Sequence, residues 1–348
     1  MFIKKIFLII YCLFSLSSVN ASGHREEIFE ARQLNLKLSS KQYHDFKKIK
    51  KSYYGESVFK ELNGSQRKIA HFYEIIRPDQ TVIYLLGTAH DLPFDVLPES
   101  VRERIQHAPN IYVESEMIAY LAFFQASSQP LSGFSNEEED AINTHLTPCL
   151  NLFHSGLKAT NLKLEDIYSA FLGFDCLLGM DSEIIMLSLA LGKPVLMLDD
   201  RIDLFETNLN LEKLMMEDDI KSLEDSKAND EEYQATLSKR DLLQNHRNVF
   251  LEKSIKENIT EIENPDKIQD TIKSSMESYA QFDANDVDSI EKDADSGHYK
   301  VSIRNMRWDR ILRTVPSQSV IGVGYGHIPD LFTIWQKEKC LIKKVRED

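Results

Sequence analysis

Short runs of β-forming residues alternate with helical segments along most of this 348-residue chain, and this alternation constrains its fold more than any other feature. The clearest example is an apolar helical segment that ends at Gly192 and Pro194, just before the β run at residues 195–198. Glycine directly after a helix and proline soon afterwards are typical helix stop signals. The pattern predicts an α/β fold with a central mixed sheet flanked by helices.

The expected elements fill the chain from residue 72 to the C terminus. Two β runs separated by the turn Arg77-Pro78-Asp79-Gln80 indicate a hairpin. A helix and another β run then complete a strand-helix-strand unit, which implies a right-handed crossover. Asp181 is expected to cap the apolar helix that Gly192 ends. The expected strands are 72–76, 81–86, 111–114, 195–198, 319–323 and 341–345, and the expected helices are 98–108, 184–191, 301–315 and 331–337.

Residues 1–21 have the composition of a cleaved secretory signal. Lys4 and Lys5 precede an apolar stretch at residues 6–16, and Val19-Asn20-Ala21 provides a small-residue exit. The apolar stretch is too short for an ordinary membrane-spanning helix. We therefore expect an exported protein, periplasmic or secreted, with no stable membrane anchor after cleavage. An uncleaved anchor is the alternative.

The rest of the chain divides into a polar segment and one large domain. Residues 22–69 are polar and lysine-rich, and we interpret them as a helical lead-in or a loosely attached arm, with the ordered core beginning near His71. Residues 70–348 form the domain. Within it, the acidic section at residues 207–297 is expected to be mostly helical and solvated, with residues 283–297 as a mobile acidic loop.

Charge and cysteine content exclude several classes of protein. The formal net charge of −14 becomes more negative once the signal segment is removed. Such a chain binds phosphate backbones poorly, so we expect no nucleic-acid partner. Cys149, Cys176 and Cys340 remain after cleavage, too few for a disulfide scaffold. Cys149 with Cys176 is the expected pair if a disulfide forms, and buried thiols are the favoured alternative.

Polar side chains lie at the ends of four expected strands. His90 and His327 each close a Gly-x-x-His motif directly after an apolar run. Glu114 and Glu116 lie at the end of the third strand, and Asp199 follows the fourth. Because the carboxyl ends of parallel strands meet at one edge of a sheet, we expect these side chains to converge.

Two imidazoles and a carboxylate, with positions left for water, form a ligand set typical of catalytic zinc, manganese or iron. A second carboxylate would serve as a proton shuttle. Simpler interpretations exist for each residue. A histidine after a strand is more often a hydrogen-bonded loop residue. Glu114 or Glu116 could be a solvated edge charge, and a helix cap would explain Asp181.

Arg304 is expected to point inward. It shares one face of its predicted helix with Trp308, Ile311 and Leu312. A buried arginine needs an anionic partner. We favour a structural ion pair with a strand-end carboxylate, and the alternative is stabilisation of negative charge on a substrate oxygen.

Over about residues 70–346 the chain resembles the TraB/GumN family, which includes the animal TIKI proteins and is similar to the erythromycin esterase and ChaN-like fold. Five motifs in order carry this resemblance and are far more specific together than singly. They are Leu86-Gly87-Thr88-Ala89-His90, Val113-Glu114-Ser115-Glu116, Gly179-Met180-Asp181 followed by Gly192-Lys193-Pro194-Val195, Arg304-Asn305-Met306-Arg307-Trp308 and Val323-Gly324-Tyr325-Gly326-His327.

The resemblance implies a mixed α/β sheet and, in the TIKI branch, a protease assisted by manganese or cobalt; zinc stays open for this chain. Glu116 stands where the family commonly has Asp, and Asp199 where it commonly has Glu. The implied site consists of the metal ligands His90, Glu114 and His327, the catalytic residues Glu116, Arg304 and Asn305, and Asp181 and Asp199 behind the ligands.

The leading hypothesis is an exported metal-dependent hydrolase, a TIKI-like metallopeptidase that acts on a peptide or protein. Glu116 would be a proton shuttle or fourth ligand, and Arg304 would stabilise the oxyanion. An alternative from another class is a non-catalytic family member that sequesters a peptide, or regulates, through the same cleft. A third hypothesis is an esterase-like hydrolase that uses a histidine base without metal.

Overall fold

The computed structural model describes residues 31–64, 68–114, 118, 121–122, 124–127, 131–172, 174–198, 213, 216–217, 220, 230–284 and 297–345. These residues belong to the compact unit Ala31–Asp348. The predicted signal peptide, most of residues 207–229 and nearly all of the predicted acidic loop lie outside the described residues.

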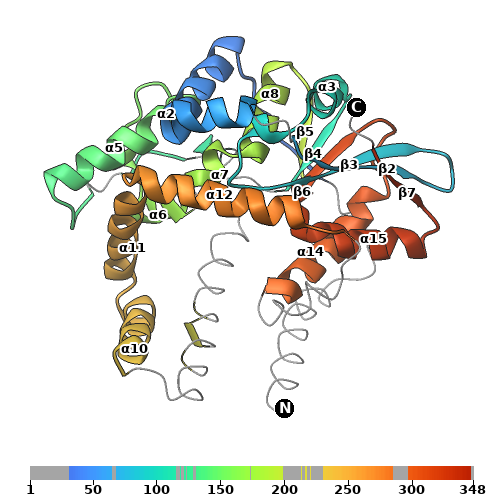
Figure 1. Ribbon diagram of the computed structural model, residues 1–348. Helices are drawn as coiled ribbons and strands as arrows, with labels where there is room; N and C mark the ends of the chain where they lie inside the picture. Colours follow the sequence, from blue (N-terminus) through green and yellow to red (C-terminus); the bar gives the residue numbers. More distant parts are fainter. Residues whose placement is uncertain are drawn as a thin grey trace, which may run out of the picture. The chain divides into compact units, whose positions relative to one another are not determined.

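A mixed seven-stranded sheet forms the centre of this unit (Figure 1). Its strand order is β1-β5-β4-β6-β3-β2-β7. The central strands β5, β4, β6 and β3 are parallel, whereas β1, β2 and β7 pair antiparallel at the edges. The predicted α/β class is therefore confirmed. The strands are β1 (Arg32–Gln33), β2 (His71–Ile76), β3 (Val82–Thr88), β4 (Ile111–Val113), β5 (Val195–Met197), β6 (Val320–Gly324) and β7 (Leu341–Lys344).

Helices cover both faces of the sheet. Gly322 approaches Ile184 of α8, whereas Gly87 approaches Ile328 of α15. Gly87 is in register with Val323, the neighbour of Gly322, and adjacent strand residues point to opposite faces. The helices are α2 (Ser40–Gly64), α3 (Glu99–His107), α5 (Asn136–Leu150), α6 (Leu164–Leu172), α7 (Phe174–Leu178), α8 (Met180–Ala190), α10 (Asp230–Asn245), α11 (Arg247–Ile262), α12 (Pro265–Gln281), α14 (Gly297–Leu312) and α15 (Ile328–Lys337).

The predicted hairpin is present as β2 and β3, and each expected strand and helix differs from its observed counterpart by a few terminal residues. The end of α8 also follows the prediction. Gly192 has φ = 70° and donates its N–H to Leu189, while the N–H of Lys193 bonds Ser188. Glycine tolerates this left-handed backbone, and the two bonds satisfy carbonyls at the helix end.

The start of α8 differs from the prediction. Gly179 is the N-cap residue, and no side chain caps the helix there. Asp181 lies inside the first turn with none of its surface exposed, so its predicted role as the cap is wrong. The helix is buried on all sides from Met180 to Leu189, and a carboxylate within it needs a partner elsewhere.

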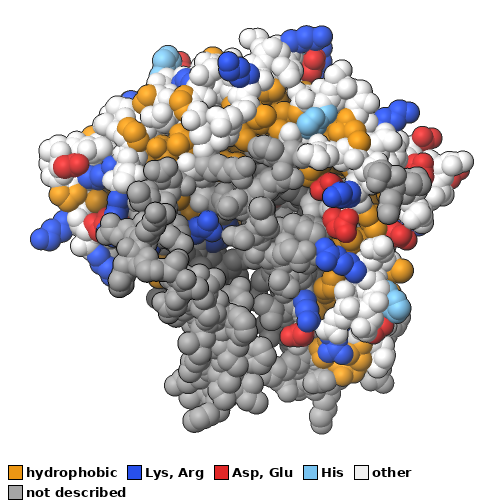
Figure 2. All heavy atoms as spheres, turned by 180° about the vertical axis from the view of Figure 1, so that it is seen from behind, with side chains coloured by type: hydrophobic (Ala, Val, Ile, Leu, Met, Phe, Trp, Pro, Cys, Tyr) orange, Lys and Arg blue, Asp and Glu red, His pale blue; other side chains and the backbone are white. Residues whose placement is uncertain are grey.

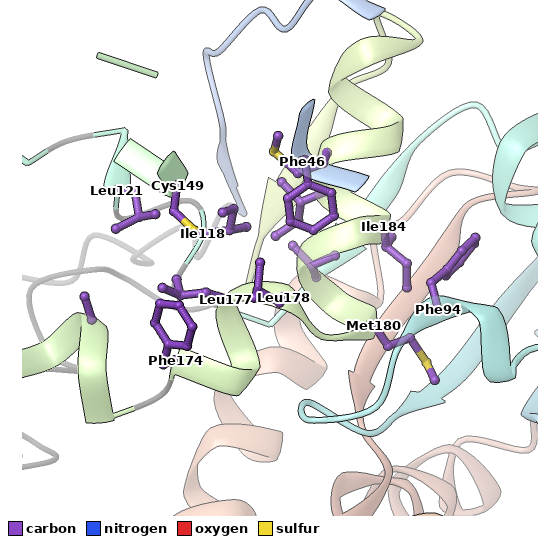
Figure 3. Packing of buried hydrophobic residues seen from close by; sticks show 14 of the residues in the cluster. Phe46, Phe94, Ile118, Leu121, Cys149, Phe174, Leu177, Leu178, Met180 and Ile184 are labelled. Carbon is purple, nitrogen blue, oxygen red and sulfur yellow. The ribbon is translucent and has the colours of Figure 1, made fainter. Parts of the chain in front are cut away.

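The predicted lead-in is part of the core, and the expectation of a core that begins near His71 is wrong. β1 pairs with β5, and α2 contributes Phe46, which is fully buried. Figure 3 shows Phe46 packed beside α8 in the same cluster as Met180 and Ile184. Apolar residues along this lysine-rich segment therefore pack α2 against α8 in the core.

Two further expectations need correction. The section at residues 230–281 is helical as predicted, but α11 is not a solvated helix because Phe250, Leu251 and Ile255 are buried in it. Cys149 is fully buried and free, so the conditional pairing with Cys176 is wrong, and the favoured interpretation as a buried thiol is confirmed for Cys149. Burial raises the pKa of the Cys149 thiol to about 12.

The described surface carries charges of both signs. On the face shown in Figure 2, described acidic and basic side chains lie close together among hydrophobic ones. Within the described ranges, no helix is both long and apolar enough to cross a membrane.

Candidate functional site

Three of the predicted site residues meet at the carboxyl edge of the parallel strands. Register pairs Thr88 of β3 with Gly324 of β6, and Gly322 of β6 with Val113 of β4. His90 follows β3, Glu114 follows β4, and His327 follows β6. The order β4-β6-β3 places Glu114 and both histidines at adjacent strand ends, as the sequence predicts.

The carboxylate of Glu114 is the centre of this cluster. Its Oε1 lies 3.5 Å from His327 Nε2 and forms an ion pair with Arg304 Nη2, while its Oε2 lies 3.8 Å from His90 Nε2. The backbone N–H of Gly324 donates to Oε2 at 2.8 Å. Glu114 is only 4% exposed, so these neighbours replace water around the charge.

Opposing effects act on the pKa of Glu114. Burial alone would raise the pKa, because a charged carboxylate is poorly solvated in the interior. His327, Arg304 and His90 outweigh burial and hold the pKa well below its ordinary value of 4.5. Glu114 is therefore ionised at neutral pH and acts as an anion.

Asp181 fixes the tautomer of His90. Its Oδ2 lies 2.8 Å from His90 Nδ1, and an ionised carboxylate only accepts hydrogen bonds. Nδ1 therefore carries the proton, and Nε2 of the neutral ring has a lone pair on the side of Glu114. A carboxylate behind a histidine in this way orients ligands in metal sites. The His90 side chain is 37% exposed and accessible from solvent.

Asn305 fixes the tautomer of His327 in the same way. Its amide nitrogen donates to the His327 carbonyl at 3.3 Å and to Asp330 at 3.5 Å, so its Oδ1 is the atom that faces His327 Nδ1 at 2.7 Å. Nδ1 of His327 must donate, so a neutral ring has its lone pair on Nε2. The Trp308 ring, 4.5 Å away, packs against the imidazole.

Arg304 makes the predicted ion pair on the inner face of α14. Its guanidinium also lies 4.7 Å from the centre of the Trp308 ring, and its Nη1 donates to His327 Nε2 at 3.5 Å. The side chain is 19% exposed. Arg304 therefore borders solvent, whereas Asn305 is fully buried and can act only through His327. The predicted catalytic role of Asn305 becomes one of positioning.

The donor chemistry of the cluster fits a divalent transition metal. Two Nε2 lone pairs and an ionised carboxylate are ligands that manganese, cobalt and zinc accept. Among the residues that the structure describes, no three His, Cys, Asp or Glu side chains lie in the arrangement of an assembled metal site. Glu116 and Asp199, the other two predicted carboxylates, lie outside the described residues.

Sequence reasoning missed two contacts in this site, the N–H of Gly324 with Glu114 and the ring of Trp308 beside His327. The contact between Asp181 and His90 agrees with the implied position of Asp181 behind the ligands, although a helix cap was the simpler interpretation. A backbone donor and a ring contact leave no recognisable pattern in a sequence.

Comparison with known proteins adds nothing to this geometry: no protein-family model, curated protein or solved structure matches the chain. The resemblance to the TraB/GumN family stays a prediction from the motifs. The function is therefore argued from the site.

Proposed function

We propose that this protein is an exported metal-dependent hydrolase, a TIKI-like metallopeptidase of the TraB/GumN family that acts on a peptide or protein. One observation carries the proposal. The Nε2 atoms of His90 and His327 both lie within 3.8 Å of the ionised Glu114. The signal-like residues 1–21 support export, and the negative charge argues against a nucleic-acid partner.

In this proposal His90, Glu114 and His327 hold a manganese, cobalt or zinc ion. Such an ion, when bound, lowers the pKa of a water molecule and polarises a carbonyl. Asp181 and Asn305 hold the two imidazoles in the required tautomer and orientation. Mutation of a hydrogen-bond partner behind a metal ligand typically lowers metal affinity or activity by about 10- to 100-fold.

Arg304 has the contacts needed to bind a developing oxyanion. Its guanidinium is partly exposed and is held in place by Glu114 and the Trp308 ring. Fixed donors of this type stabilise transition-state charge because they need no reorganisation during the reaction. Glu116 would be the proton shuttle or a fourth ligand.

A metal-free hydrolase is the second candidate, and the contact between Asp181 and His90 favours it. A histidine whose Nδ1–H is held by a carboxylate is a competent general base at Nε2. In this candidate no metal ion is needed to balance the charge of Glu114, because Arg304 already forms an ion pair with it. The two functions differ in one measurable respect, because only the metal-free enzyme works in the presence of a chelator.

Peptide cleavage followed by mass spectrometry tests the proposal. The purified protein should cleave peptides with manganese and lose activity with a chelator. His90→Ala and His327→Ala should lose both manganese binding and cleavage, whereas His44→Ala, at an exposed position on α2, should retain both. Undiminished cleavage in either site variant contradicts the mechanism. Activity that survives the chelator selects the metal-free candidate, and peptide binding without cleavage by the wild type selects a sequestering protein.

A further inference from the structure

A cavity of about 360 Å³ adjoins the turn that carries His90. It is lined by residues of α2, the α6–α7 region, α11 and α12, together with Asp91 from the turn itself. Figure 1 shows α12 passing beside α2, and the two helices are in contact. A concave space of this size is typical of a site for a small molecule or one large side chain.

Aromatic rings form one wall of the cavity. Tyr53 packs edge-on against Tyr54 and Phe174, with ring centres 5.0 and 5.4 Å apart, and Phe171 stacks on Phe174 at 5.8 Å. All four line the cavity. Figure 3 shows Phe174 on α7 next to Leu177, so this wall continues into the packed core. Rings held by such contacts offer a rigid surface with negative electrostatic potential at the ring faces.

Carboxylates outnumber basic groups among the lining residues. Asp91, Glu261 and Asp270 line the cavity together with one ammonium group, that of Lys267. Lys267 pairs with Glu261 at 2.9 Å. Asp91 is half-buried and Asp270 is exposed at the rim, and a neutral apolar ligand would desolvate these charges without compensation. An organic cation matches both the rings and the charge.

The cavity is linked directly to the turn that holds His90. The hydroxyl of Tyr54 donates to the backbone carbonyl of Asp91 at 3.0 Å, and Ser275 of α12 donates to the Asp91 carboxylate. Asp91 is the next residue after His90 in the chain. A group bound in the cavity would therefore lie against the same turn that presents the histidine.

We propose that this cavity binds the cationic side chain of an arginine or lysine residue in the peptide substrate. The aromatic wall receives the cation, and Asp91 and Asp270 compensate its charge. The identity of the ligand as part of a peptide substrate rests on the proposed hydrolase function. The binding chemistry does not, because it involves neither His90 nor a metal.

Calorimetric titration of the full chain without added metal tests the binding. The probes are N-acetyl-arginine amide and the isosteric but uncharged N-acetyl-citrulline amide. We expect the arginine compound to bind at least about tenfold more tightly, because citrulline lacks the cation that rings and carboxylates recognise. Equal affinity for the two compounds, or no binding of the arginine compound at millimolar concentration, overturns the proposal.

Two variants locate the binding, and a third is their control. Asp270→Asn and Tyr53→Leu should each weaken binding of the arginine compound about threefold or more. Glu277→Gln makes the same change in charge on an exposed position of α12 outside the cavity lining, and its affinity should equal that of the wild type. Circular dichroism checks that all three variants are folded. Wild-type affinity in folded Asp270→Asn and Tyr53→Leu contradicts the proposed place of binding.

A cleavage assay separates failure of this inference from failure of the proposed function. Matched peptides that contain arginine or citrulline are compared. Cleavage without preference for arginine overturns the cavity proposal and leaves the hydrolase intact. Selective binding of the arginine compound without any cleavage supports the cavity and contradicts the hydrolase.

Discussion

At the scale of single residues, Gly324 allows the side chains of His90 and Glu114 to lie close to the backbone at the end of β6. A Cβ atom at this position would lie 2.8 Å from His90 Nε2 and 3.3 Å from Glu114 Oε2. The first distance is shorter than a carbon and a nitrogen can approach without one of them moving. Alanine can adopt the backbone angles of Gly324, so the backbone conformation does not explain this glycine. Glycine is required in the second Gly-x-x-His motif because a larger side chain would collide with His90.

Gly324→Ala should therefore displace His90 Nε2 from Glu114. We expect manganese affinity and peptide cleavage to fall about tenfold or more, with a melting temperature that changes little. Gly326→Ala is the matched control, because nothing lies within 4 Å of the added methyl group, and it should behave as the wild type does. A Gly324→Ala protein with wild-type cleavage would show that this contact is irrelevant to activity.

At the scale of elements, a buried ion pair fastens α2 to the helix that supports His90. Lys50 of α2 and Glu183 of α8 are each 3% exposed and form a salt bridge, and Tyr43 donates to Glu183 at 3.1 Å. Lys50 also bonds Asp95 at 2.6 Å. Because Glu183 is in the same first turn as Asp181, this pair anchors the part of α8 that orients His90.

Lys50→Met should leave Glu183 buried without its cation. We expect a loss of about 3–5 kcal/mol in the free energy of unfolding, measured by urea denaturation. Lys48→Met, at a position where the side chain is 66% exposed, should change stability by less than about 0.5 kcal/mol. The double variant Lys50→Met with Glu183→Leu should be more stable than Lys50→Met alone, because the more deeply buried carboxylate, that of Glu183, is no longer left without its cation. Equal stability of Lys50→Met and Lys48→Met would contradict a role for the pair.

At the scale of the whole molecule, His71 makes the stability depend on pH. Its Nε2 donates to the carbonyl of Tyr279 at 2.6 Å, and its Nδ1 is buried with no hydrogen-bond partner within the described part of the chain. Burial lowers the pKa of His71 below its ordinary value of 6.5. Since the unfolded chain then binds the proton more readily, stability is complete above pH 6.5 and is lost as the pH falls toward the folded pKa.

Urea denaturation at pH 7.5 and pH 5.5 measures this effect. The wild type should lose stability between the two values, and His71→Gln, whose amide can still donate to Tyr279, should lose less. The difference between the two proteins isolates His71 from other titrating groups. An identical pH dependence in both would show that His71 is protonated equally in the folded and unfolded states.

The local parts of the fold were predictable from the sequence. The hairpin turn, the Gly192 stop signal and the β runs each depend on a few neighbouring residues, and their boundaries differ from expectation only at the ends. The position of α2 was not predictable, because its burial depends on partners such as Glu183 that lie far away in the chain. Asp181 illustrates the same limit, since a cap and a histidine partner leave the same residue in the sequence.

By itself, the sequence determined the α/β class and the convergence of His90, Glu114 and His327, because strand ends in a parallel sheet meet at one edge. Only the tertiary structure decided which ring nitrogen of each histidine faces its hydrogen-bond partner, which carboxylate pairs with Arg304 and how much space Gly324 leaves. The physical reason is the separation along the chain between the groups that interact. A strand or a turn is fixed by its own neighbours, whereas a tautomer, an ion pair or a close approach is fixed by groups that folding brings together from distant parts of the chain.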